Sequence, residues 1–282
     1  MVVEGIPLDP GMGLTGWMTV LPQPAAKPGG ALELMALGEM VLLEGEVAPA
    51  LAELKKQGFQ VESDLGPFRG GSPTVERLYF SGQGLRWKMG PAVQALNHYL
   101  SRSQPRVPKT PTSVLASPTP TPHPLKGAEA LWAQVEGVLG PGQRQGQLLH
   151  YSYPWNESVS KDGVELPRDY GVVTEFHFQK VEGLVEGGKG PLGLSVKGTQ
   201  PVVAVTGQFA LRAGEVELVR DILSRHGATI EGTDRRWTGL LPDLVFADFW
   251  VVGRPIEVAQ TLKTALEAVN NSRPKETPTP AH

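Results

Sequence analysis

The feature that most constrains this chain is a segment that occurs twice, 169 positions apart. Residues 45–58 read GEVAPALAELKKQG, and residues 214–227 read GEVELVRDILSRHG. Over the wider windows 38–62 and 207–231, eight of 25 positions are identical. Each copy starts an apolar helical pattern with a glutamate and ends it with a glycine, which suits the two ends of a helix. The sequence therefore predicts one folding unit that is present twice.

Each copy is predicted to fold as two strands, a helix, two more strands and a closing helix. The segment EGIPLDPGMGLTGWMTV (4–20) parallels DGVELPRDYGVVTEFHF (162–178), and Pro91 and Pro255 are predicted to open the closing helices. Strand–helix–strand–strand–helix is most of a ferredoxin-like unit, which has an antiparallel sheet with helices on one face. The predicted fold class is α+β, with two related ferredoxin-like β-α-β-β-α repeats, antiparallel sheets and a pseudo-two-fold arrangement.

Composition divides the chain into four predicted parts. Residues 1–101 form the first repeat, and residues 128–272 form the second, which has an extra N-terminal helix and strand. Residues 102–127 are a linker rich in Pro, Thr and Ser, and residues 273–282 are a disordered tail. Because the first repeat lacks the extra helix and strand, we expect Met1 to lie inside a longer natural unit.

Bulk composition argues against several classes of function. A net charge of −3 and a pI near 6.1 give no broad positive surface, so nucleic acid is not an expected partner. The chain has no cysteine, which excludes disulfides and thiolate chemistry. No apolar run is long enough for a membrane span. The protein is expected to be either exported, with its leader removed, or cytoplasmic.

The segments GEMVLLEGEVAPALAELKKQG and GQFALRAGEVELVRDILSRHG, with the upstream IPLDPGMGLTGWMTV, resemble the LppY/LpqO family. This is a bacterial family of unknown function in which the unit is often doubled. Its members are often exported or lipid-anchored, which the resemblance implies for this chain as well. The similarity covers residues 4–100 and 128–270.

The chain departs from that family at the positions of its usual His-Asn-His motif. In the two copies those positions hold Leu65-Gly66-Pro67 and Asp234-Arg235-Arg236. A further family histidine is replaced by Tyr79 and Asp248. The resemblance therefore implies a non-catalytic relative in which this histidine chemistry is lost.

One arrangement of residues suits acid–base chemistry. In the strand TEFHF, Glu175 and His177 share a face because alternate residues of a strand point the same way. Asp248 lies in the strand LVFADFWVV, so the three side chains converge if the strands are neighbours. They are the candidate catalytic residues of a hydrolase-like or metal-assisted enzyme. The alternative is a solvent-facing polar row, or a buried His–Asp pair that only fixes the sheet. In the first copy the matching positions hold Trp17, Thr19 and Tyr79.

The six histidines show no local spacing typical of a metal site, so neither a metal nor a cofactor is expected. The segment DRRW offers candidate ligand-binding residues. Arg235 and Arg236 can clamp a carboxylate or phosphate, and Trp237 can stack on the ligand. The alternative is a solvated turn. A small anionic ligand is the expected partner, and the sequence does not specify an oligomeric state.

Three functions follow from these patterns. The first is a non-catalytic module that binds a small ligand in a cleft between the two repeats. The second is an enzyme that uses the Glu175, His177 and Asp248 cluster. The third is a protein-interaction domain that uses exposed aromatic residues and the Pro-rich linker.

Overall fold

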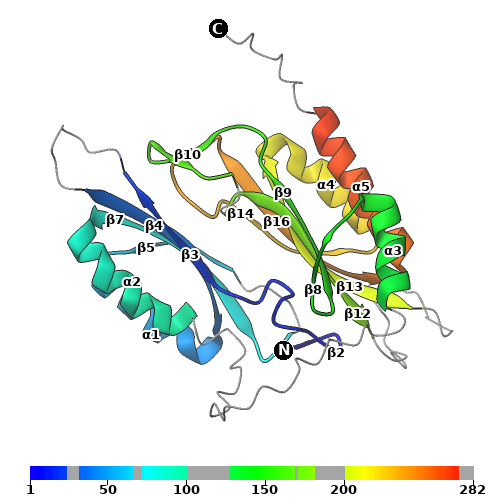
Figure 1. Ribbon diagram of the computed structural model, residues 1–282, viewed down its shortest axis with the longest axis horizontal. Coiled ribbons are helices and arrows are strands. Elements are labelled where there is room, and N and C mark those ends of the chain that lie inside the picture. Colours follow the sequence, from blue (N-terminus) through cyan, green and yellow to red (C-terminus); the bar gives the residue numbers. More distant parts are fainter. Residues whose placement is uncertain (24–31, 66–70, 101–127, 169–170, 182–200, 273–282) are drawn as a thin grey trace, which may run out of the picture.

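The computed structural model describes residues 1–23, 32–65, 71–100, 128–168, 171–181 and 201–272. Two β-sheets face each other, and helices cover the outer face of each sheet (Figure 1). The layers therefore run helices, sheet, sheet, helices. The neighbouring strands of both sheets pair in antiparallel fashion, which confirms the α+β class.

The first sheet has the strand order β3-β4-β7-β5. Its strands are β3 (Trp17–Pro22), β4 (Glu33–Leu43), β7 (Val75–Leu85) and β5 (Gln60–Leu65). Its outer face is covered by α1 (Glu44–Lys56) and α2 (Arg86–Leu100). Ala50 and Leu54 of α1 and Leu96 of α2 are fully buried against this face, so apolar burial holds the two helices in place.

The second sheet has the order β14-β16-β13-β12-β9-β8. Its strands are β14 (Thr229–Asp234), β16 (Leu244–Gly253), β13 (Val202–Arg212), β12 (Val173–Val181), β9 (Leu148–Pro154) and β8 (Gln143–Gln145). Its outer face is covered by α3 (Ala128–Leu139), α4 (Val216–Arg225) and α5 (Pro255–Ser272). The predicted extra helix and strand are thus α3 and β9, and β9 pairs directly with β12.

Four strands and two helices occur in the same order in both units. The order β12-β13-β16-β14 repeats the order β3-β4-β7-β5, with α1 and α4 after β4 and β13, and α2 and α5 after β7 and β16. The second unit adds α3, β8 and β9. Both sheets have a register shift at the same place, between Val61 and Ser63 and between Ile230 and Gly232. Common descent of the two units stays a prediction, as do the domain boundaries.

Each unit also carries a small three-stranded sheet. The first comprises β1 (Val2–Val3), β2 (Ile6–Pro7) and β6 (Gly71–Ser72), and the second comprises β10 (Val159–Lys161), β11 (Val164–Leu166) and β15 (Leu240–Leu241). Tight turns at Glu4-Gly5 and Asp162-Gly163 have positive φ at both residues. This is the conformation of a type I′ hairpin turn, so the two turns are equivalent.

The glutamate and the glycine of each repeated segment lie at the two ends of a helix, as predicted. The Glu46 carboxylate accepts a hydrogen bond from the Leu43 backbone N–H at the start of α1. The Glu215 carboxylate accepts one from the Arg212 N–H, where the 3-10 turn Ala213–Glu215 leads into α4. Gly58 and Gly227 follow the helices with φ of 80° and 78°. A left-handed residue at these positions suits glycine, so the sequence signal for both helix ends is confirmed.

The prediction that Pro91 opens the second helix is wrong, because α2 already begins at Arg86 and Pro91 lies inside it. Met89 is 4% exposed and packs in the core beneath the helix, so burial favours the additional turn. Pro255 does open α5 as expected. Proline is favoured in the first turn of a helix, and in α2 the burial of Met89 outweighs that preference.

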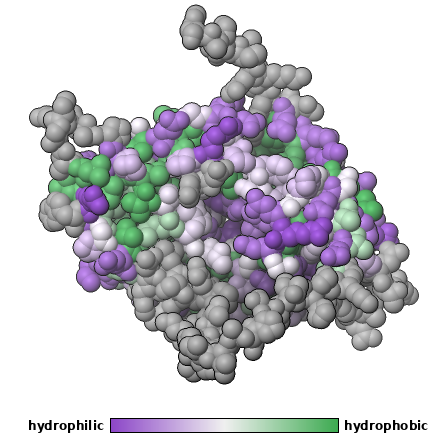
Figure 2. Space-filling model, viewed as in Figure 1, coloured by the Kyte–Doolittle hydropathy of each residue, from purple (hydrophilic) through white to green (hydrophobic). Residues whose placement is uncertain are grey.

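The linker (102–127) and the tail (273–282) lie outside the described residues. Within the described ones, the helices are too short or too polar to cross a membrane. Figure 2 shows hydrophobic surface on the side of the molecule where the first sheet lies. Val20 of β3 and Leu32, which precedes β4, are 38% and 42% exposed. The large apolar side chains recorded as exposed in the described ranges are all aliphatic, so they include none of the exposed aromatics expected of an interaction domain.

Candidate functional site

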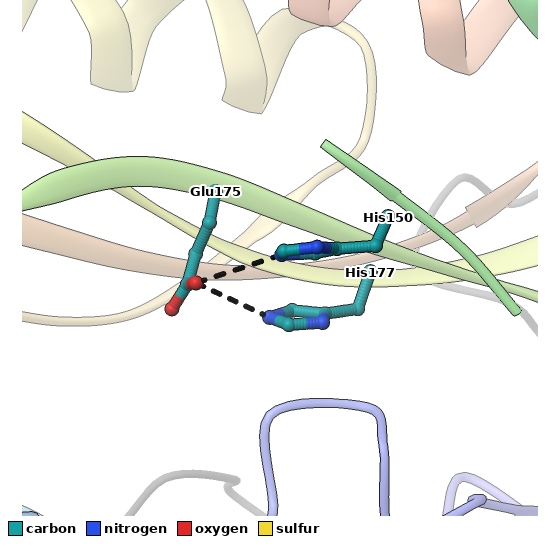
Figure 3. Close-up of side chains that lie close together, drawn as sticks. All are labelled: His150, Glu175 and His177. Atoms are coloured by element: carbon teal, nitrogen blue, oxygen red, sulfur yellow. Dashed lines mark ion pairs between the residues drawn. The ribbon is translucent and has the colours of Figure 1, made fainter. Parts of the chain in front are cut away.

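The register of two neighbouring strands builds a cluster of three polar side chains on the inner face of the second sheet. His150 of β9 lies directly opposite His177 of β12 in the antiparallel ladder. Glu175 precedes His177 by two residues and therefore points to the same face. Figure 3 shows the carboxylate of Glu175 facing the edges of both imidazole rings.

The three side chains approach one another without forming close hydrogen bonds. The Nε2 atoms of His150 and His177 each lie 3.7 Å from the same oxygen, Oε2 of Glu175. The two rings stack with centroids 4.6 Å apart and planes 21° apart. A separation of 3.7 Å exceeds a normal hydrogen bond. Both Nε2 atoms are buried and have no hydrogen-bond partner among the described residues.

The carboxylate of Glu175 is held in its ionised form. Burial raises the pKa of Glu175, but the two imidazoles beside it outweigh that effect, so the pKa lies well below its usual range. The cluster therefore offers one carboxylate oxygen and two imidazole nitrogens within 4.8 Å of one another. These are the donor types that zinc and related divalent ions prefer.

An N-terminal loop between β2 and β3 lies against this cluster. The Thr206 hydroxyl on β13 donates to the Met12 carbonyl at 2.8 Å, and Nη2 of Arg77 on β7 donates to the Gly13 carbonyl at 3.0 Å. The loop is thus bonded to both sheets. A Cβ atom at Gly13 would lie 3.6 Å from Cδ2 of the His177 ring, and the φ of +75° at this position suits glycine.

Asp248 does not join the histidine cluster. In the ladder Asp248 lies opposite Gln208, and Gln208 lies opposite Glu175, so a whole strand separates Asp248 from β12. Its carboxylate instead accepts hydrogen bonds from Arg77 Nη1 at 2.8 Å and from Arg236 Nη2 at 2.7 and 2.8 Å. Of the predicted catalytic set, the structure brings Glu175 and His177 together and places Asp248 in an ion pair between the sheets.

The segment DRRW does not form one exposed anion clamp. Arg235 is exposed and pairs with Asp243. Arg236 is 1% exposed; its guanidinium donates to Gln208 and Asp248 and lies 4.5 Å above the ring of Tyr79. Trp237 is buried and makes edge contacts with Trp17, Tyr79 and Phe246. Arg235 is exposed while Arg236 and Trp237 are buried, so the three side chains do not line one surface.

Around Asp248 lies a buried network of charges that joins the two sheets. Arg77 Nε lies 3.1 Å from Glu39 Oε1, and the other oxygen of Glu39 accepts from Trp17 Nε1 at 3.0 Å. Burial raises the pKa of Glu39 although Arg77 opposes it. A second cross-sheet pair joins buried Lys161 to Glu62 at 3.1 Å. The network around Asp248 and the Lys161–Glu62 pair thus both join the first unit to the second.

The residue that sequence reasoning missed is His150. The signal was present, because QLLHYSYPW is an alternating strand with His150 on the face opposite Leu149 and Tyr151. Spacing along the sequence could not reveal a pair that forms across two strands. Only the register, in which His150 faces His177, turns two separate histidines into one site.

Comparison with known proteins gives a family match over part of the chain. Residues 194–268 match a family described as Domain of Unknown Function (DUF1259). That stretch contains β13, α4, β14 and β16 and much of α5. No curated protein matches this chain. The match supports the presence of a domain of unknown function in this part of the chain. The resemblance to the LppY/LpqO family rests on the sequence segments compared above.

Among solved structures, a point mutant of I-SmaMI is 13% identical, with 86% of this chain and 79% of the other covered and a TM-score of 0.16. Meganuclease I-SmaMI bound to uncleavable DNA is 12% identical, with 93% and 91% covered and a TM-score of 0.15. Scores this low do not indicate a shared fold, so these two similarities carry no argument about this protein.

Proposed function

We propose that this protein binds one divalent transition-metal ion of the zinc class through His150, Glu175 and His177. The observation that carries the proposal is the pair of buried Nε2 atoms, each 3.7 Å from one ionised oxygen and without a hydrogen-bond partner among the described residues. A buried polar atom without a partner costs about 1–3 kcal/mol, and an ion is a common explanation for such an atom.

The spacing suits such an ion. Zinc bonds of about 2.0–2.1 Å in tetrahedral geometry place ligand atoms about 3.4 Å apart. The observed Nε2–Oε2 separations of 3.7 Å need only a small inward shift to reach that value. The rings stack with their planes 21° apart, so we expect them to splay as both nitrogens turn toward the ion.

Three protein ligands leave at least one coordination position for a ligand from solution. This favours the first function considered above, a module that binds a small ligand, with the metal at its centre. The second candidate is metal-assisted hydrolysis, because an ion with three protein ligands can also activate water. The buried network of Asp248, Arg77 and Arg236 joins the two sheets behind this site.

Family membership is proposed on the same basis. The match to an unknown-function domain over residues 194–268 and the repeated Gly-Glu-Val segments support a place near the LppY/LpqO family. The cluster on β9 and β12 lies outside the usual His-Asn-His positions. We therefore propose that this bacterial-type member relies on a different histidine pair, with no nucleic acid as partner.

Isothermal titration calorimetry with zinc tests the proposal on tag-free protein. We expect one ion per chain and a loss of affinity of at least about tenfold in His150→Gln and in His177→Gln, because each removes one ligand. His226→Gln is the matched control, since His226 is exposed at the C-terminal end of α4. Equal zinc affinity in all four proteins would refute the proposed site.

A further inference from the structure

A cavity of about 250 Å³ lies on the outer side of the second sheet, between the end of α4 and the start of α5. Its apolar lining consists of five side chains that are each at most 7% exposed: Leu223, Ala228, Val251, Val258 and Leu262. Figure 1 shows α4 and α5 on the side of this sheet that faces away from the first sheet. The histidine cluster lies on the inner face, so the cavity is a separate site.

The first unit shows which group fits at the equivalent place. Residues of the two units correspond at an offset of 169, because β14 and β16 pair in the register of β5 and β7. Ala228 and Val251 therefore correspond to Phe59 and Gly82. Phe59 is 5% exposed, and its ring lies so close to Gly82 that an added Cβ would be 2.6 Å from Cδ1 of the ring. The first unit thus holds an aromatic ring at the position that Ala228 and Val251 line in the second.

Cationic side chains surround the apolar part of the cavity. The lining also includes Arg225, His226 and Arg254, together with the acidic Glu257. The side chains of Arg225 and Arg254 are 75% and 57% exposed, so they stand at the solvent side. Each guanidinium has five N–H groups, and the printed bonds to Asp221 and Glu257 occupy one apiece. An apolar interior beside two arginines suits a ligand with an apolar body and one negative charge.

We infer that this cavity binds a small aromatic carboxylate, with its ring over Ala228 and Val251 and its carboxylate at Arg254. A cavity of about 150 Å³ accepts benzene, so a volume of about 250 Å³ has room for a ring with a short side chain. The inference goes beyond the proposed metal site and does not depend on it. It places the expected anionic ligand at the junction of α4 and α5 instead of at the DRRW segment.

Fluorine NMR with para-fluorophenylacetate tests the inference on the full chain, in buffer with a chelator so that no metal ion binds the carboxylate. We expect saturable binding with a dissociation constant below about 1 mM. Arg254→Gln removes the cation and should weaken binding by at least about tenfold. Arg220→Gln is the matched control, because Arg220 is a partly exposed arginine of α4 that pairs with Glu217 and does not line the cavity. Its affinity should equal that of wild type.

The double variant Ala228→Phe/Val251→Gly rebuilds the Phe59–Gly82 pair of the first unit inside the cavity. Its ring takes the place of the ligand, so we expect saturable binding to be lost. Absence of saturable binding to wild type in the millimolar range, or equal affinity of wild type and Arg254→Gln, would overturn the inference and leave the metal site untouched. If the double variant does not fold, the neutral para-fluorophenylacetamide decides, because equal binding of the amide and the carboxylate would contradict the ion pair.

Discussion

Replacing Asp248 by asparagine is expected to destabilise the fold strongly. The carboxylate binds Arg77 at 2.8 Å and Arg236 at 2.7 Å, and the side chains of these two arginines are 10% and 1% exposed. After Asp248→Asn, Arg77 keeps Glu39. Among the described residues Arg236 keeps the Gln208 oxygen, the rings of Tyr79 and Phe246, and a carboxylate 3.8 Å away on Asp234. Leaving a buried charge without its partner costs about 3–5 kcal/mol.

Asp243→Asn is the matched control for this prediction. It breaks the Asp243–Arg235 pair, in which the two side chains are 62% and 59% exposed. Exposed pairs contribute about 0–1 kcal/mol, so the free energy of unfolding is expected to stay close to wild type. Urea denaturation followed by fluorescence and circular dichroism measures both variants. A cost below about 1 kcal/mol for Asp248→Asn would refute the view that this network holds the two sheets together.

Three further predictions follow from the structure. The free energy of unfolding of Glu39→Gln should stay within about 1 kcal/mol of wild type at pH 7, because burial disfavours the ionised carboxylate and raises the pKa of Glu39 in the fold. As the pH falls from 7 to 4 this carboxyl group becomes protonated, so wild type should gain stability relative to the variant. An opposite trend in urea denaturation would contradict this. Gly38→Ala places a Cβ against the Trp17 carbonyl oxygen and should lower the free energy of unfolding by more than about 2 kcal/mol. In the control Gly45→Ala the added Cβ meets nothing within 4 Å, so thermal denaturation should show unchanged or increased stability. Glu175→Gln should lower zinc affinity by at least about tenfold because it removes the carboxylate ligand, and equal affinity by calorimetry would contradict this.

Much of the fold could be predicted from the repeated segment. The glutamate and the glycine at the two ends of each Gly-Glu-Val helix are local signals, and the long strands β4, β13 and β16 are recognisable as apolar runs. Pro91 shows the limit of such signals, because the burial of Met89 extends α2 beyond it. Local pattern therefore predicts which elements form better than it predicts where a helix begins.

The candidate site was predicted only in part, for a physical reason. Glu175 and His177 share a face through strand alternation, which the sequence shows directly. His150 joins them only because β9 pairs with β12 in one particular register. Arg236 and Trp237 looked like exposed ligand-binding residues, but the second sheet packs against the first and buries both. Contacts between distant segments depend on tertiary packing, which short motifs do not encode.

A zinc-edge anomalous difference map from crystals grown with zinc would locate the proposed ion itself. We expect one peak bonded at about 2.0–2.1 Å to Nε2 of His150, Nε2 of His177 and one oxygen of Glu175. A map with no peak between these three side chains, or with its main peak at another group, would contradict it.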